Sequence, residues 1–249
     1  MRALVFNAAF YLATALFMIL GSPLLLGSRQ AAMAGLRAHA RTTVWLLRVI
    51  VGTRLEVRGL DKLPGGPALI AAKHQSTWDT IGLIPIFHDP ALIMKAELLR
   101  IPLYGWFSRK FEMIAIRREA GPAALRQLLR DARERASEGR QIVIFPEGNR
   151  RAPGAPPDYK PGVVLLYEGL QLPCVPVAVN SGLFWPRRRL MKYPGVIIVE
   201  ILDPIPAGVP REAFRQRLAH VIEEATARLM AEGLAAQPAA ASERSPVPD

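Results

Sequence analysis

The sequence predicts an α/β protein, a layered sheet with flanking helices, preceded by a pair of membrane-associated N-terminal helices. Seven short apolar runs alternate with amphipathic segments, as in strands and helices that pack in layers. Residues 3–28 contain no charged side chain. The chain of 249 residues suits one domain with appendages. We therefore expect membrane-embedded or interfacial helices over 1–52, an α/β domain over 53–234 and a disordered, Ala-, Pro- and Ser-rich tail over 235–249.

The N-terminal segment is expected to enter a bilayer, because about 18 consecutive apolar residues are enough for a membrane helix. One arginine precedes the apolar stretch and five follow it by residue 54, so the positive-inside rule places the domain on the cytoplasmic side of the inner membrane. Residues 30–52 mix arginine with apolar side chains, as in an interfacial helix. The first helix spans the membrane, or both helices dip in from one face. A cleaved signal peptide is the alternative, which the length of the stretch and Arg29 disfavour.

The remaining elements follow from hydrophobic period and turn residues. The runs predicted as strands are 54–58, 68–72, 91–95, 113–117, 141–145, 174–179 and 195–202. The segments predicted as helices are 77–85, 121–138, 162–170 and 211–233. In the second of these helices, an apolar stripe of leucines lies opposite arginines, so one face is expected to pack on the sheet.

His74 and Asp79 are the first candidate catalytic residues. His74 follows the strand predicted over 68–72, and Asp79 comes five positions later. Residues five apart do not share a helix face, so the two can meet only if His74 lies in the turn before a helix capped by Ser76. The carboxylate would then fix the imidazole tautomer and leave the other ring nitrogen free. A histidine of ordinary pKa suits removal of a proton from an alcohol at neutral pH.

The same residues also permit two other interpretations. Ser76 and Asp79 form a capping box of the form S-x-x-D, in which Asp79 only satisfies backbone N–H groups. Ser76 is also the nearest candidate nucleophile for a Ser/His/Asp lipid hydrolase, although the sequence contains no G-x-S-x-G elbow. The pair alone therefore does not decide between these functions.

A second polar cluster follows the strand predicted over 141–145. The turn of Pro146, Glu147 and Gly148 leaves charged and amide side chains at the end of this strand. Arg150 offers a planar fork that suits two phosphate oxygens, and Gly148 allows close approach of the backbone to a ligand. Glu147 is expected to position arginine side chains or a glycerol hydroxyl.

A third cluster ends the strand predicted over 113–117. Arg117 and Arg118 point in opposite directions if the strand continues, so only one of them is expected to face the site. We favour Arg118 for this role.

In this order, the clusters resemble the sequence blocks of the glycerophospholipid acyltransferases, most closely the bacterial 1-acylglycerol-3-phosphate acyltransferases. His74 to Asp79 is similar to the first block, Met113 to Arg118 to the second, Phe145 to Arg150 to the third, F-P-E-G-T-R, and Leu172 to Val177 to the fourth. The ordered occurrence of four blocks, over roughly residues 55 to 205, is far more specific than any one of them.

The resemblance implies a glycerolipid acyltransferase-like fold and the transfer of a fatty acyl group to the sn-2 hydroxyl of 1-acylglycerol 3-phosphate, forming phosphatidic acid. Acyl-CoA or acyl-acyl carrier protein is the implied co-substrate, without a cofactor or metal. His74 would act as base and Asp79 would orient it. Arg118 or Arg117 and the third block would hold the acceptor, the third-block residues being Glu147, Gly148, Asn149 and Arg150.

Three positions depart from the family pattern. Glu112 stands in place of a common glycine, Arg117 in place of a common aspartate, and Asn149 in place of a common threonine or serine. Asn149 retains hydrogen-bonding capacity, so the third block is expected to work. Arg117 adds a charge of the opposite sign, so Arg117 and Arg118 both stay candidates for the phosphate.

The formal charge of +11 and the pI near 10.5 imply an acidic partner. The sequence lacks a zinc-ligand pattern, a basic recognition helix and an aromatic RNA-binding signature, so a membrane with anionic lipids is expected and nucleic acid is not. Residues 184–193 combine Trp and Tyr with Arg and Lys, which is typical of a loop that rests on lipid headgroups. Cys174 is the single cysteine and is expected to pack in the core.

Other functions compatible with the sequence are acylation of another lysolipid, such as lyso-ornithine lipid or lysophosphatidylcholine, lipid hydrolysis, and non-catalytic membrane binding by a basic protein. The acyltransferase interpretation requires His74 to lie near Glu147 and Arg150 at one edge of the sheet.

Overall fold

A mixed sheet of seven strands forms the centre of the computed structural model, which describes residues 1–117 and 121–236. The strand order is β1-β7-β6-β2-β5-β3-β4. The strands are β1 (Thr53–Arg58), β2 (Leu69–Ala72), β3 (Pro90–Lys95), β4 (Ile114–Ile116), β5 (Gln141–Ile144), β6 (Cys174–Val179) and β7 (Gly195–Ile201). β6, β2, β5, β3 and β4 run parallel, whereas β7 pairs antiparallel with β6 and parallel with β1. All seven predicted strands are found, with bounds shifted by at most one residue.

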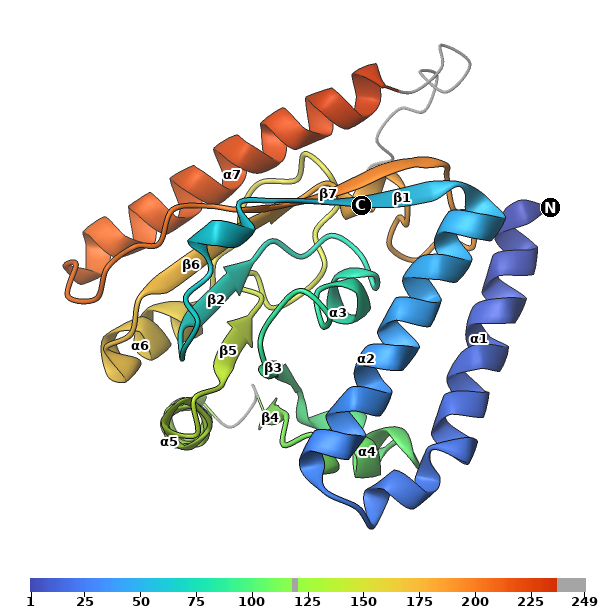
Figure 1. The fold of residues 1–249 in the computed structure, drawn as a ribbon. Helices are drawn as coiled ribbons and strands as arrows, with labels where there is room; N and C mark the ends of the chain where they lie inside the picture. The colour runs from blue at the N-terminus through green and yellow to red at the C-terminus, as the bar shows by residue number, and fades with distance from the viewer. Residues whose placement is uncertain (118–120, 237–249) are drawn as a thin grey trace.

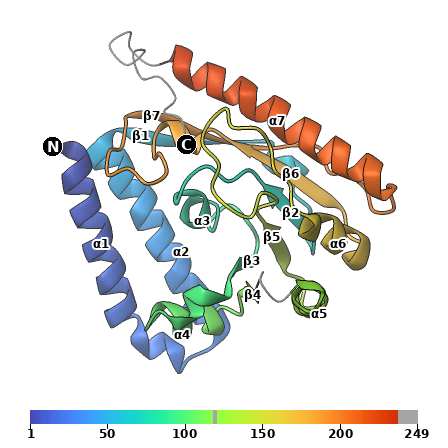
Figure 2. The ribbon, with the colours of Figure 1, turned by 180° about the vertical axis from the view of Figure 1, so that it is seen from behind.

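Helices cover both faces of this sheet (Figures 1 and 2). They are α1 (Arg2–Leu20), α2 (Arg29–Leu46), α3 (Asp79–Gly82), α4 (Tyr104–Lys110), α5 (Gly121–Ser137), α6 (Pro161–Leu170) and α7 (Arg211–Ala235). Residues of α1 and of the turns around α3 pack on one face, whereas α5, α6 and α7 pack on the other. Alternate residues of β2 serve the two faces, with Ile70 in the first cluster and Leu69 in the second. This central strand is buried on both sides, as expected for parallel sheets.

One predicted helix is much shorter than expected, one helix was missed and one ends later than predicted. The segment predicted as a helix over 77–85 contains only the short helix α3, Asp79–Gly82, followed by turns. Pro85 explains the early end, because a proline inside a helix loses a hydrogen bond and clashes with the carbonyl four residues earlier. The helix α4 was not predicted. The last helix continues to Ala235, and residues 237–249 of the predicted tail lie outside the described residues.

The helices α1 and α2 lie side by side and dock on the domain (Figures 1 and 2). Near the start of α1, Phe6 and Phe10 meet the ring of Trp185 edge-on, at centroid distances of 5.1 and 5.4 Å. Near its end, Met18 packs in an apolar cluster with Phe107 of α4. Of the described helices, α1 is the one long and apolar enough to cross a membrane, with a mean hydropathy of 2.1.

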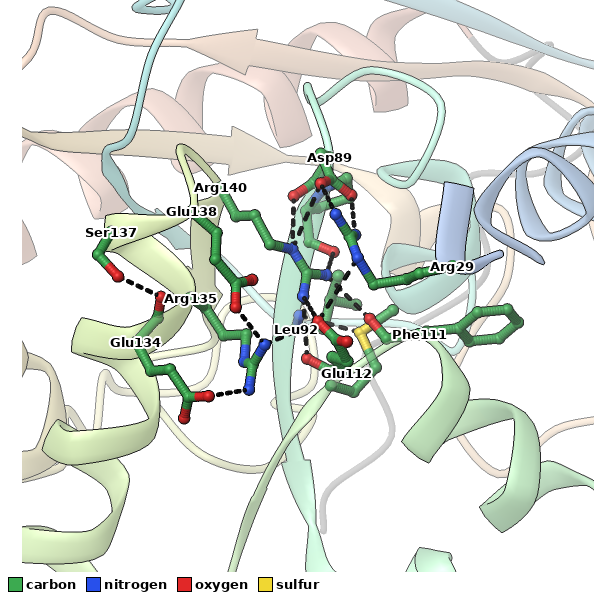
Figure 3. Close-up of polar contacts among 12 residues, drawn as sticks. Arg29, Asp89, Leu92, Phe111, Glu112, Glu134, Arg135, Ser137, Glu138 and Arg140 are labelled. Carbon is green, nitrogen blue, oxygen red and sulfur yellow. Dashed lines mark hydrogen bonds and ion pairs between the residues drawn. The ribbon is translucent and has the colours of Figure 1, made fainter. Parts of the chain in front are cut away.

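A buried arginine, Arg140, ties several loops together at the end of the sheet opposite the carboxyl ends of the parallel strands (Figure 3). Its guanidinium donates hydrogen bonds to the backbone carbonyls of Asp89, Pro90, Phe111 and Glu112. Beside it, Arg29 at the start of α2 makes two hydrogen bonds of 2.8 Å to the carboxylate of Asp89. The helix pair is therefore fastened to the sheet by charge as well as by apolar packing.

Glu112 belongs to the same network (Figure 3). Its φ of 55° is a left-handed conformation, which explains why a glycine is common at this position. In this chain the carboxylate lies 2.7 Å from Arg135 and 3.4 Å from both Arg29 and Arg140. The glutamate thus supplies a counter-ion to arginines that would otherwise repel one another.

Candidate active site

His74 lies in the turn after β2, at the carboxyl edge of the sheet, as the sequence predicts. Its Nδ1 is 2.9 Å from Oδ2 of Asp79, and its ring stacks on Phe145 with the centroids 4.1 Å apart. The His74 side chain is 11% exposed, whereas Asp79 is fully buried. Within the described part of the chain, Nε2 has no hydrogen-bond partner. The geometry therefore leaves Nε2 as the nitrogen that can accept a proton.

Asp79 orients the imidazole and also holds the turn. Its Oδ2 accepts the backbone N–H groups of Gln75 and Ser76, each at 2.8 Å. Its other oxygen, Oδ1, accepts the hydroxyl of Ser181, which follows β6 on the neighbouring strand. The catalytic and the capping interpretations of the motif are thus compatible. The position of Ser181 after the predicted strand 174–179 could have marked it as a residue at this edge of the sheet. The sequence does not indicate that it contacts Asp79.

Ser76 does not have the surroundings of a nucleophile. It is fully buried, and its Oγ accepts the backbone N–H of Trp78 at 3.0 Å. The expected helix cap is also corrected, because the residue before α3 is Trp78 and not Ser76. Cys174 lies in the core within β6, and burial raises the pKa of its thiol. Neither side chain supports a covalent mechanism in this site.

Within the described residues Glu147 does not pair with Arg150, contrary to the expectation that it positions arginines; the alternative, that it positions a glycerol hydroxyl, stays a prediction. Its carboxylate is 1% exposed and accepts a hydrogen bond of 2.9 Å from Nζ of Lys73. Lys73 also binds Glu223 of α7, at 2.7 Å. Burial raises the pKa of Glu147, and the Lys73 ammonium opposes this rise. Glu147 also lies 3.5 Å from the backbone N–H of His74, so its contacts position the turn that carries His74.

Arg150 is brought to the His74 turn, as predicted. Its guanidinium donates a hydrogen bond to Oγ1 of Thr77, a residue between His74 and Asp79. Burial is the first cause that lowers the pKa of Arg150, and the neighbouring arginines act in the same direction, while Asp79 opposes them. The imidazole, its carboxylate and a guanidinium thus meet at one edge of the sheet.

The other candidate residues are placed less centrally. Gly148 adopts a left-handed φ of 70°, which the turn requires of a glycine, and Asn149 is exposed. Arg117 is exposed at the end of β4, the edge strand. β4 is three strands from β2, roughly 14 Å at the usual strand spacing. Arg118 lies outside the described residues, so its predicted role is not visible.

Comparison with known proteins agrees with the four sequence blocks. A family model described as Acyltransferase matches residues 54–180. A 1-acyl-sn-glycerol-3-phosphate acyltransferase of Pseudomonas aeruginosa is 40% identical over 161 residues, which cover 65% of this chain and 63% of that protein. The human 1-acyl-sn-glycerol-3-phosphate acyltransferase beta is 29% identical over 195 residues, covering 73% of this chain and 70% of that protein. The chain thus matches less than two thirds of the length of the Pseudomonas relative.

The fold has a counterpart among solved structures. The crystal structure of the 1-acyl-sn-glycerophosphate acyltransferase from Thermotoga maritima matches with a TM-score of 0.77, covering 92% of this chain and 98% of that chain. The two sequences are 21% identical, so this likeness concerns the fold alone. It confirms the predicted α/β layered sheet with flanking helices.

Proposed function

The chain belongs to the acyltransferase family, and from this membership we propose that it transfers a fatty acyl group to the sn-2 hydroxyl of 1-acylglycerol 3-phosphate, forming phosphatidic acid. The acyl donor is a thioester, acyl-CoA or acyl-acyl carrier protein. Both relatives described above carry the name of this activity. The observation that supports the proposal is the contact of Arg150 with Thr77, which brings a guanidinium, a group suited to phosphate, to the His74 to Asp79 turn.

His74 and Asp79 supply the proton chemistry of this reaction. Nε2 of His74 takes the proton of the acceptor hydroxyl while its oxygen attacks the thioester carbonyl carbon. The new C–O ester bond forms, the C–S bond breaks, and the thiolate leaves with the proton that the imidazole took up. Asp79 stabilises the imidazolium that exists between these two transfers. General-base assistance of this kind contributes about 10² to 10⁴ in rate.

The acceptor is held by its charged end at this edge of the sheet. Arg150 binds the phosphate, as a planar guanidinium can contact two phosphate oxygens. Gly148 and Asn149 lie in the same turn as Arg150 and line the path of the acceptor to it. Glu147 acts indirectly, because it holds Lys73 and the backbone of the turn rather than the substrate. A phosphate monoester is therefore preferred over a zwitterionic or phosphate-free headgroup.

We place the protein at the cytoplasmic face of the inner membrane, with α1 lying in the interface. Both halves of α1 pack on the domain, through Phe6 and through Met18. A helix that crossed the bilayer in this arrangement would carry the polar domain into hydrocarbon. The face of α1 turned away from the domain exposes apolar residues, which suits burial among lipid chains. These residues are Leu4, Val5, Tyr11, Leu12, Leu16, Ile19 and Leu20.

A lysolipid panel with purified protein tests the proposal. We expect transfer to lysophosphatidate and much weaker transfer to lysophosphatidylcholine and lyso-ornithine lipid. His74→Ala should remove transfer while the variant still binds vesicles. Complementation of a strain that cannot convert lysophosphatidate to phosphatidate tests the same activity in cells. Near-normal turnover by folded His74→Ala protein, or acyl release without an acceptor, would contradict the assignment.

A further inference from the structure

The loop of residues 184–193 is fixed to the rest of the protein. The backbone N–H of Tyr193 donates to the carbonyl of Phe184 at 2.9 Å and closes the base of the loop. Asn7 of α1 donates to the carbonyl of Leu190 at 2.8 Å. The ring of Trp185 is 6% exposed and packs on α1. The sequence expectation that Trp185 lies among lipid headgroups is therefore wrong, although Leu190 is exposed.

A lysine braces the same loop from inside. Lys192 is 6% exposed, and its Nζ donates to the carbonyls of Arg189 and Leu190 at 3.1 Å. The ammonium also lies 5.0 Å from the centroid of the Trp185 ring. Because both the base and the tip of the loop are held, its backbone is fixed, and so are the positions from which Arg187, Arg188 and Arg189 extend.

One of these arginines, Arg187, is directed at the catalytic edge. Its Nη1 donates a hydrogen bond of 2.7 Å to the backbone carbonyl of Arg150. The Arg187 side chain is half-buried, whereas Arg188 and Arg189 are exposed. Arg150 in turn contacts Thr77 in the His74 to Asp79 turn, so the Arg187 guanidinium lies beside the proposed phosphate ligand.

Positive side chains gather around Arg150. Burial lowers the pKa of Arg150, Arg187 and Arg188 lie close enough to lower it further, and the Asp79 carboxylate opposes this shift. Within the described residues, neither Arg187 nor Arg188 forms an ion pair. Arg150, Arg187 and Arg188 thus gather positive charge beside the Asp79 carboxylate. A phosphate monoester carries about −1.5 to −2 at neutral pH, so it can pair with more than one guanidinium group.

We propose that Arg187 is a second ligand of the acceptor phosphate, placed beside Arg150 by the loop that α1 holds in position. This inference rests on the proposed function and adds a specificity-determining residue to it, from a segment outside the four sequence blocks. Arg187 favours a phosphate monoester over a phosphodiester, because a monoester offers more charge and more free oxygens to two guanidinium groups. Arg188 contributes to the local field without a direct contact.

Kinetics of Arg187→Ala and Arg189→Ala test the proposal. Arg189 is the matched control, since it lies in the same loop and is exposed. For Arg187→Ala we expect KM for lysophosphatidate to rise about 10- to 100-fold, as a charge-assisted contact is lost, with kcat within a few-fold of wild type. The preference for lysophosphatidate over lysophosphatidylcholine should shrink by a similar factor. Arg187→Lys should recover part of the loss, and Arg189→Ala should stay within two-fold of wild type.

A vesicle-binding experiment distinguishes two anions that Arg187 could bind, the acceptor phosphate and the headgroups of membrane lipids. Cosedimentation with phosphatidylglycerol vesicles should be equal for wild type and Arg187→Ala. An unchanged KM and headgroup preference in Arg187→Ala, an equal effect of Arg189→Ala, or a KM change that follows lost vesicle binding would overturn the assignment. Wild-type protein that transfers to no lysolipid would instead overturn the proposed function.

Discussion

Replacing Asp79 with asparagine isolates the charge that assists His74. The asparagine carbonyl can accept the three hydrogen bonds now made to Oδ2, from His74, Gln75 and Ser76. The amide NH₂ can donate to Ser181, whose hydroxyl changes from donor to acceptor. The turn is therefore expected to keep its shape, while the imidazolium formed during the reaction loses its counter-ion.

The size of the effect follows from the geometry. With Nδ1 and Oδ2 2.9 Å apart, the charge centres of the imidazolium and the carboxylate are separated by about 4 Å. At an effective dielectric constant of about 20 their attraction is about 4 kcal/mol, or roughly three decades in rate. We expect kcat of Asp79→Asn to fall by about 10² to 10³-fold. Stability should change by less than about 2 kcal/mol, because the neutral amide costs less to bury.

The assay follows the release of CoA thiol from an acyl-CoA in mixed micelles with lysophosphatidate, together with thermal unfolding of each variant. Ser181→Ala is the matched control, since it removes one hydrogen bond from Asp79 but keeps its charge. This control should lose less than ten-fold in kcat. A folded Asp79→Asn protein with kcat within three-fold of wild type would refute the reasoning. So would an equal loss in both variants.

Three further predictions concern stability. Glu112→Gly relieves a left-handed φ but removes the counter-ion of buried Arg140, so urea unfolding should show a net loss of about 1–3 kcal/mol; a gain would contradict this. Lys73→Met leaves Glu147 buried without its partner and should lower the free energy of unfolding by about 3–5 kcal/mol. Adding Glu147→Leu to this variant should restore most of that loss. A double variant no more stable than Lys73→Met alone would argue against the pair. Burial lowers the pKa of Lys192 to about 8, below its value in the unfolded chain, so the folded state loses this proton at lower pH than the unfolded state does. The free energy of unfolding should therefore rise between about pH 8 and 10, by up to about 3 kcal/mol relative to Lys192→Met. Parallel curves of unfolding free energy against pH for the two proteins would exclude this.

Much of the fold and the centre of the site could be predicted from local sequence. β-branched runs bounded by Gly and Pro gave the strands, and polar residues directly after two of them gave the site. β2 and β5 are neighbours in the sheet, so His74 and Arg150 meet at one edge as expected. The family pattern also marked Glu112 as unusual, and the structure supplies the reason in its backbone conformation.

The remaining site contacts join segments that are distant in sequence. Ser181 reaches Asp79, and Arg187 reaches Arg150, because β6 inserts between β7 and β2. Hydrophobic period within a run contains no information on this order. Lys73 pairs with Glu147 because both side chains are buried next to each other. Two charged residues far apart in the sequence give no sign of such burial. The helix α4 begins after Leu103 in a left-handed conformation without a side-chain cap, so it lacks the usual start signals.

The helix pair α1 and α2 is fastened to the domain at both ends, through Trp185 and through the Arg29 to Asp89 pair. With α1 in the interface, as proposed above, these two attachments would hold the imidazole of His74 at one height over the lipid plane. The proposed lysolipid acceptor would then rise by the same distance whatever the length of its tail. A longer tail therefore leaves more methylene groups behind in the leaflet without moving the attacking oxygen.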